Sequence, residues 1–145
     1  TQRITQLLDH YQIPSKYLVF EITETTYIHN IDAVNQMIRF FHDRDIRISM
    51  DDFGSADSSL NSLKDILFDG VNIDNHGRAA GLSEKGKIVL EEMFHLLKRT
   101  DKWIVCEGVE TKEMVDFLIA EGCDELQGFY YYKPMEQKKF EELIA

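Results

Sequence analysis

The chain has few cysteines, prolines and positive charges, and it lacks long apolar runs. Its 145 residues include two cysteines and two prolines, and 16 lysines and arginines stand against 26 aspartates and glutamates, a formal charge of −10. Such an acidic surface does not attract a nucleic-acid backbone, so we expect no nucleic-acid polymer as a partner. No stretch is long enough to cross a bilayer and no secretory signal is visible, so we expect no membrane segment and a cytoplasmic location.

The cysteines and histidines show no metal-ligand spacing. Cys106 lies within an apolar run, which favours an ordinary buried thiol, and Cys123 completes no ligand motif with it. None of the five histidines is spaced to share a metal with another. Oxygen-rich strand ends without histidine favour Mg²⁺, Mn²⁺ or Ca²⁺ over zinc.

The chain does contain a regular alternation of apolar runs and amphipathic stretches. The apolar runs predict strands over residues 17–20, 46–50, 70–74, 103–106 and 126–132. Apolar residues at helical spacing predict helices over residues 3–11, 33–41, 60–67 and 87–98, from a cap at Thr111 to Gly122, and after Pro134. About five strand–helix repeats predict an α/β fold, a parallel sheet with helical crossovers.

Polar side chains stand where several of these strands end. Asp51 and Asp52 directly follow the run 46–50, and two adjacent carboxylates repel each other unless a cation or a proton lies between them. Other strands end in the polar residues Glu21, Asp74, Glu107 and Gln127. Because active sites of parallel α/β folds lie at the carboxyl ends of the strands, we expect these groups to meet in one site. Two divalent cations there would suit phosphodiester hydrolysis.

Each strand-end group also has an ordinary structural explanation. Glu21 could precede a helix N-terminus, the pair Asp51–Asp52 could form a cap or turn, and Asp74 could be a plain N-cap. The segment after Glu107 could be a simple strand-to-helix turn, and Gln127 could lie in a bulge. Their joint occurrence at successive strand ends favours a shared functional site.

The predicted strands are too few for a closed barrel. Such a barrel needs eight strands and about 250 residues, whereas apolar patterning gives about five strands here. The sheet is either open or a piece of a barrel, and no linker, repeat or low-complexity segment divides residues 1–145, so we expect a single domain. An open piece exposes strand edges and apolar faces, which predicts a homo-oligomer or packing against the rest of the parent protein.

Five blocks of the chain, in this order, resemble the EAL domain family of cyclic-di-GMP phosphodiesterases. They extend over most of the chain, from about residue 17 to residue 134. The blocks are FEITET at 20–25, DDFGSADSSL at 51–60, DGVNID at 69–74, CEGVET at 106–111 and GCDELQGFYYYKP at 122–134. The last two are long and specific, and together the blocks identify the chain as similar to the C-terminal portion of such a domain.

This resemblance implies an incomplete TIM-like (β/α) barrel of about five parallel units with outer helices. It also implies Mg²⁺- or Mn²⁺-dependent hydrolysis of cyclic-di-GMP, which becomes the candidate ligand. The family's metal ligands fall on Glu21 and Asp51, with Asp52 at the second metal or its water and Asp74 supporting the second metal site. By the same resemblance Glu107 would be the general base, Gln127 would line the ligand pocket, and Glu24 would stabilise the loop after Asp52.

The chain departs from the family pattern at several positions. The name-giving Glu-Ala-Leu block and a downstream asparagine ligand belong to strands that would precede Thr1. Asn72, in the ligand site, stands where the family has a catalytic lysine, so a dipole replaces a full positive charge. Ala56 and Asp57 replace a glycine and a tyrosine, which restricts the loop and adds a carboxylate beside an anionic ligand.

These departures predict a degenerate EAL domain. Removing one electrostatic group from such a site typically costs about 10²–10³ in rate, and several are changed here. We expect a non-catalytic domain that acts in cyclic-di-GMP signalling as a ligand-sensing or protein-interaction module, with weak or absent metal binding. The alternative is an active metal-dependent phosphodiesterase whose missing strands lie in the parent chain.

Overall fold

The computed structural model describes residues 2–23, 30–54, 63–74 and 83–145 and shows a five-stranded parallel sheet with helices around one side of it. The strands are β1 (Val19–Thr23), β2 (Arg47–Asp51), β3 (Gly70–Asp74), β4 (Trp103–Glu107) and β5 (Glu125–Leu126). The helices are α1 (Gln2–Tyr11), α3 (Ile31–His42), α5 (Glu84–Arg99), α6 (Lys112–Ala120) and α7 (Gln137–Ile144). The α/β class and the five parallel strands are as predicted.

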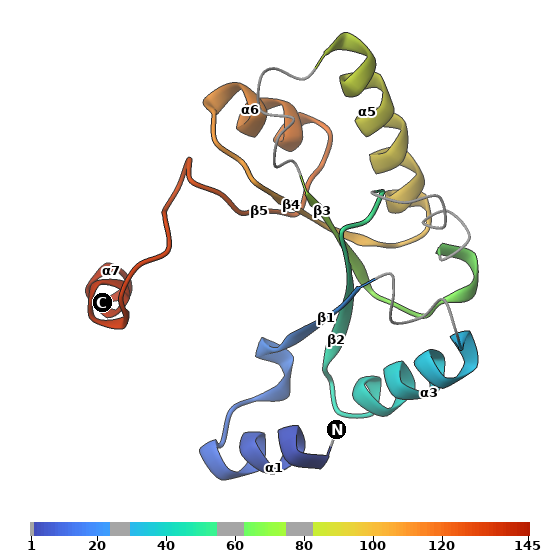
Figure 1. Cartoon of the computed structure of the whole chain (residues 1–145), viewed down its shortest axis with the longest axis vertical. Helices are drawn as coiled ribbons and strands as arrows, with labels where there is room; N and C mark the ends of the chain where they lie inside the picture. The colour runs from blue at the N-terminus through green and yellow to red at the C-terminus, as the bar shows by residue number, and fades with distance from the viewer. Residues whose placement is uncertain (1, 24–29, 55–62, 75–82) are drawn as a thin grey trace.

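The strands follow one another across the sheet in the order in which they occur in the sequence. Each pairs in parallel with the next, from β1–β2 to β4–β5. A doubly wound sheet reverses this order at one point, whereas a barrel keeps it. Helices α1, α3, α5 and α6 lie in an arc around the sheet (Figure 1). This arrangement is that of a barrel segment.

Local sequence signals explain where the helices begin and which side they bury. The side chains of Asn30, Ser83 and Thr111 accept hydrogen bonds from the first turns of α3, α5 and α6. After α6, Gly122 takes a φ of +84°, the conformation that ends helices, so both predicted boundaries are confirmed. The buried side chains recur at helical spacing, as in Leu90, Phe94 and Leu97 of α5, and pack with the apolar strand residues into one core.

Three predicted elements are corrected by the structure. The first strand begins at Val19 because residues 15–17 form a short 3₁₀ turn after Pro14. The helix predicted over 60–67 is helical at residues 63–65 in its described part, and residues 66–68 lie outside regular structure. The last strand, predicted over 126–132, ends at Leu126, because the chain then turns and the Gly128 carbonyl accepts from the Tyr131 and Tyr132 amides.

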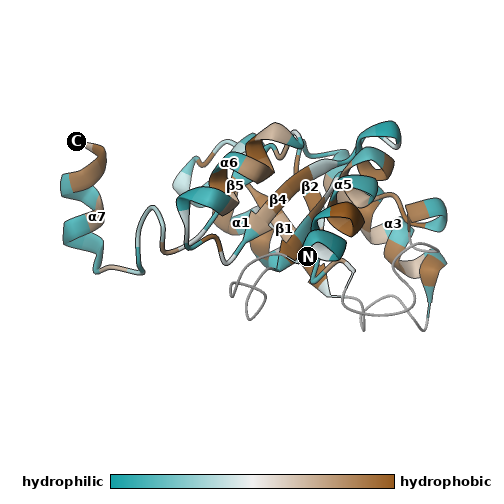
Figure 2. Ribbon diagram, turned by 90° about the horizontal axis from the view of Figure 1, so that it is seen from above, coloured by the Kyte–Doolittle hydropathy of each residue, from teal (hydrophilic) through white to brown (hydrophobic). Residues whose placement is uncertain are grey.

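The C-terminal helix α7 stands apart from the other helices. Figures 1 and 2 show it beyond the β5 edge, connected by an extended segment. Phe140, Leu143 and Ile144 are 50%, 45% and 66% exposed. The helix predicted after Pro134 is confirmed, but its apolar side packs on no layer of the sheet. Among the described helices, none has the length and apolarity to cross a bilayer.

Candidate functional site

Strand register brings the predicted acidic residues to one end of the sheet. Thr23 pairs with Asp51 between β1 and β2, and Asp74 pairs with Glu107 between β3 and β4. Glu21 lies two residues before the end of β1, so its side chain shares a face with that of Thr23. The carboxyl ends of four strands therefore meet at one edge, as the sequence predicts.

Asn72 of β3 connects this edge through its side-chain amide. Its Nδ2 donates to Glu21 Oε1 at 2.8 Å and to Glu107 Oε1 at 3.0 Å. Its Oδ1 accepts from Ser49 Oγ of β2 at 2.6 Å. Asn72 is 2% exposed and Ser49 is 0% exposed. One buried amide thus joins β1, β2 and β4 and uses both of its N–H groups on carboxylates.

The carboxylates of the site influence one another electrostatically. Burial, followed by the nearby charges of Glu21 and Asp51, raises the pKa of Glu107 above its usual range. The hydrogen bond from Asn72 acts in the opposite direction, and Asp74 adds a further, smaller repulsion. Glu21, Asp51 and Asp74 therefore lie close enough to Glu107 to affect its pKa, as expected for groups at neighbouring strand ends.

The pair Asp51–Asp52 makes a tight turn at the end of β2. The backbone N–H of Asp52 donates to Asp51 Oδ1 at 2.9 Å, and Asp52 takes a left-handed φ of +55°. Asp52 is exposed, whereas Asp51 is half-buried beside the other strand ends. The turn role that the sequence allowed is thus present, together with the electrostatic link between Asp51 and Glu107.

The carboxylates as placed do not fit a bound cation. Over residues 2–23, 30–54, 63–74 and 83–145 there is no group of three or more His, Cys, Asp or Glu side chains that could hold a metal ion. Glu21 and Glu107 accept from the Asn72 amide instead. Metal ligation by Glu21, Asp51, Asp52 and Asp74 stays a prediction.

Gln127 lies in the turn after β5 rather than in a strand bulge. Its backbone N–H donates to the Cys106 carbonyl at 2.8 Å, and its carbonyl accepts from the Val109 N–H at 3.1 Å. A Cβ on Gly128 would lie 2.1 Å from the Val109 carbonyl oxygen, so only glycine fits there. The loops after β4 and β5 are thereby held together.

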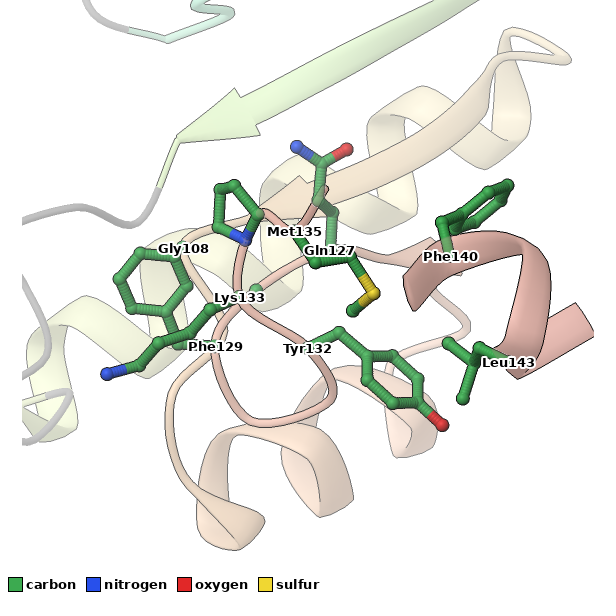
Figure 3. A pocket seen from close by; sticks show the side chains of 10 residues that line it. Gly108, Gln127, Phe129, Tyr132, Lys133, Met135, Phe140 and Leu143 are labelled. Atoms are coloured by element: carbon green, nitrogen blue, oxygen red, sulfur yellow. The ribbon is translucent and has the colours of Figure 1, made fainter. Parts of the chain in front are cut away.

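A pocket of about 380 Å³ opens between the loop after β5 and α7. Figure 3 shows Tyr132 and Met135 extending toward Phe140 and Leu143 of α7, with Gln127 at the rim. Sequence reasoning placed Gln127 at a ligand pocket but assigned the aromatic run 129–132 to a buried strand. The run is exposed, and its residues Phe129 and Tyr132 line the pocket instead.

Some predicted features lie outside the described residues, and one buried polar side chain at the site was not predicted. Glu24, Ala56 and Asp57 fall in the undescribed segments. The residues after Asp74, in which a helix capped by Asp74 would begin, are also undescribed. Ser49 was not singled out, although a lone hydroxyl within the apolar run 46–50 was a visible signal. Cys106 is fully buried, as predicted, and the hydrogen bond with Cys123, together with burial, raises its pKa.

Comparisons with known proteins agree with this geometry. The family model described as the EAL domain matches residues 1–134. The chain is 32% identical to the signaling protein YkoW of Bacillus subtilis over 97% of this chain and 18% of that protein. It is 35% identical to the probable cyclic di-GMP phosphodiesterase PdeG of Escherichia coli over 81% of this chain and 24% of that protein.

The fold matches that of solved EAL domains. The EAL domain of Mycobacterium smegmatis DcpA superposes with a TM-score of 0.91 at 26% identity, covering 99% of this chain and 65% of that chain. This likeness confirms the TIM-like barrel fold in incomplete form. The chain spans about a fifth to a quarter of the length of the two curated relatives and about two thirds of the solved domain.

Proposed function

The chain belongs to the EAL domain family, and from this premise we propose that it is a degenerate member that senses cyclic-di-GMP without hydrolysing it. Its relation to cyclic-di-GMP phosphodiesterases supports the choice of ligand, since PdeG carries that activity in its name. We further propose that residues 1–145 are one partial domain, and that it works in the cytoplasm, whose reducing conditions suit the free thiols Cys106 and Cys123.

The observation that carries this proposal is the engagement of Asn72. In the family a lysine at this position places a full positive charge beside the phosphate and the attacking water. Here an amide dipole stands there and donates to Glu107, the predicted general base, and to Glu21, a predicted metal ligand. Catalysis depends on charges positioned to stabilise the transition state. In this site the neutral Asn72 amide instead donates to the carboxylates of the site.

The metal part of the family mechanism receives little support from this site. The family is divalent-metal dependent, and a bound Mg²⁺ or Mn²⁺ would supply charge at the phosphodiester. The described side chains do not fit such an ion as they stand. We therefore propose weak or absent metal binding, and we assign no chemical step to a metal.

The remaining predicted residues take ligand-binding and supporting roles in this proposal. Gln127 and the aromatic pocket beside it would contact the nucleotide, because aromatic side chains stack well on bases. Glu24 would stabilise the loop that follows Asp52. The acidic cluster repels phosphate, so affinity must come from the pocket and from backbone amides rather than from charge.

One observation favours the alternative, an active phosphodiesterase. A general base works best with a pKa near the operating pH, and the pKa of Glu107 is raised in that direction. Activity would further require the lysine's charge to be supplied by another group. We rank this second, because Asn72 occupies the lysine position.

A calorimetric titration of the full-length protein with cyclic-di-GMP tests the proposal. We expect saturable binding in both EDTA and Mn²⁺ buffers, with the dinucleotide recovered intact by chromatography. Absence of binding in both buffers would contradict sensing and favour a protein-interaction role. Recovery of linear dinucleotide would contradict the non-catalytic assignment.

A further inference from the structure

Two polar side chains are buried side by side inside the sheet. Ser49 lies on β2 and Asn72 on β3, and they are the buried polar residues within the described part of the chain. Ser49 pairs in register with Gly70, and Asn72 follows two residues later, so both side chains point to the same face. Burial of polar groups is costly unless they are hydrogen-bonded, and here each satisfies the other.

Ser49 and the two carboxylates together hold the Asn72 amide in one orientation. The Ser49 hydroxyl donates to Asn72 Oδ1 at 2.6 Å, which holds the amide oxygen on the β2 side. The amide nitrogen then faces the strand ends, where its two N–H groups reach Glu21 and Glu107. A reversed amide would place its oxygen against two carboxylates, which repel it because none of the three groups could donate a hydrogen bond.

We propose that Ser49 is a positioning residue that locks Asn72 against Glu21, a predicted metal ligand, and Glu107, the predicted general base. The inference rests on the proposed function and deepens it, because the locked amide occupies two carboxylates that a cation at this edge would need. The locked amide links β1 to β4 through β3. A cation that binds these carboxylates competes with two charge-assisted hydrogen bonds, which are stronger than neutral ones.

Removing the Ser49 hydroxyl weakens this competition. In Ser49→Ala the Asn72 oxygen stays buried without its donor, so the locked orientation loses the free energy of one buried hydrogen bond. A cation then displaces the Asn72 amide from Glu21 and Glu107 at a lower cost in free energy. We expect Mn²⁺ to bind Ser49→Ala about tenfold more tightly than the wild-type protein, the factor expected for one such bond.

The test is an Mn²⁺ titration of the full-length protein, followed by the electron paramagnetic resonance signal of free Mn²⁺. Ser15→Ala is the matched control, because it makes the same change in the 3₁₀ turn of residues 15–17. The direction of the effect separates positioning from a structural role, since damage to the fold weakens metal binding. An Mn²⁺ affinity of Ser49→Ala equal to or below that of wild type would overturn the lock.

A second measurement needs neither metal nor a variant. Selective ¹⁵N-asparagine labelling reports proton exchange of the Asn72 side-chain amide in EDTA, with exposed Asn30 as internal reference. The lock predicts exchange at least about tenfold slower at Asn72 than at Asn30, because both N–H groups are bonded and buried. Equal exchange rates would overturn it.

The two proposals fail separately. Turnover of cyclic-di-GMP by the wild-type protein would contradict the non-catalytic assignment but would leave the amide exchange at Asn72 unaffected. An unchanged Mn²⁺ affinity in Ser49→Ala would contradict the lock and leave dinucleotide sensing in place.

Discussion

At the residue scale, Glu107 is held in an electrostatically unfavourable position. It is partly buried and close to the charges of Glu21 and Asp51, and its pKa is raised as a result. The raised pKa means that the folded state binds a proton more readily than the unfolded chain. The contribution of Glu107 to stability is therefore fully present below the unfolded pKa and is lost as pH rises through the folded pKa.

Glu107→Gln removes this penalty and keeps an oxygen to accept from Asn72. We expect the variant to be more stable than wild type at pH 7 by at most about 1 kcal/mol, allowing for solvent screening of a partly exposed group. The difference should narrow as pH falls toward about 4.3, where an unfolded glutamate is half protonated. Urea unfolding at several pH values measures it, with exposed Glu91→Gln as control. A variant less stable than wild type at pH 7 would contradict this account.

The sequence predicts which residues gather but not how they bond. Glu21, Asp51, Asp74 and Glu107 were predictable because each follows an apolar run, and parallel strands end at one edge. The bonds of Asn72 were not predictable, because its partners lie 51 and 35 residues away and depend on how far the sheet curves. The asparagine at a position where the family has lysine drew attention to residue 72, but it did not predict the hydrogen bonds that Asn72 makes.

At the scale of elements, the loops after β4 and β5 are joined at Gly128. A Cβ there would meet the Val109 oxygen at 2.1 Å and the Val109 nitrogen at 2.3 Å. Val109 and Gln127 also share a backbone hydrogen bond of 3.1 Å. The side chain of Gln127 and the aromatic pocket therefore depend on a glycine that leaves room for the neighbouring backbone.

Gly128→Ala should separate these two loops. We expect it to lower the free energy of unfolding by about 2–3 kcal/mol, because backbone atoms must shift to admit the methyl group. Gly122→Ala is the control for backbone strain without crowding: its φ of +84° is strained for alanine, but the nearest atom is Lys98 Cε at 3.9 Å. It should cost about 1 kcal/mol. Equal losses for the two variants in urea unfolding would contradict the packing role of Gly128.

Element boundaries were predictable where local signals mark both ends. Strand β3 was predicted with its observed bounds, and Thr111 and Gly122 delimit α6 as expected. The last strand was mispredicted, because the aromatic run 129–132 has strong strand propensity but the turn at Gly128 overrides it. Tertiary packing against Val109 decided this segment, and no local pattern reports that contact.

At the scale of the whole molecule, the sheet is open and α7 is unpacked. Apolar side chains of α7 are exposed, as are Phe129 and Tyr132 beside the pocket. The strand alternation predicted an open sheet or a piece of a barrel, because five repeats are fewer than a closed barrel needs. The resemblance to the EAL family implied the barrel segment. The partner that covers these apolar groups is not encoded in the apolar pattern of this chain.

The isolated 145-residue chain should self-associate. Within the described part of the chain, the edge strands β1 and β5 have one neighbour each and the apolar side of α7 is exposed, and groups of this kind promote association. Multi-angle light scattering across a concentration series should show a mass above 16.9 kDa that rises with concentration. Phe140→Ser should lower the association, with the polar substitution Lys138→Ser on the same helix as control. A concentration-independent monomer would contradict this prediction.

The measurement that tests the central claim most directly is Mn²⁺-dependent hydrolysis of cyclic-di-GMP by the full-length protein. The linear product is separated by chromatography after prolonged incubation, and Glu107→Gln defines the background. Because Asn72 stands in place of a lysine and engages Glu21 and Glu107, we predict that wild type and Glu107→Gln form equally little product. Product that forms with wild type and disappears in Glu107→Gln would contradict the claim.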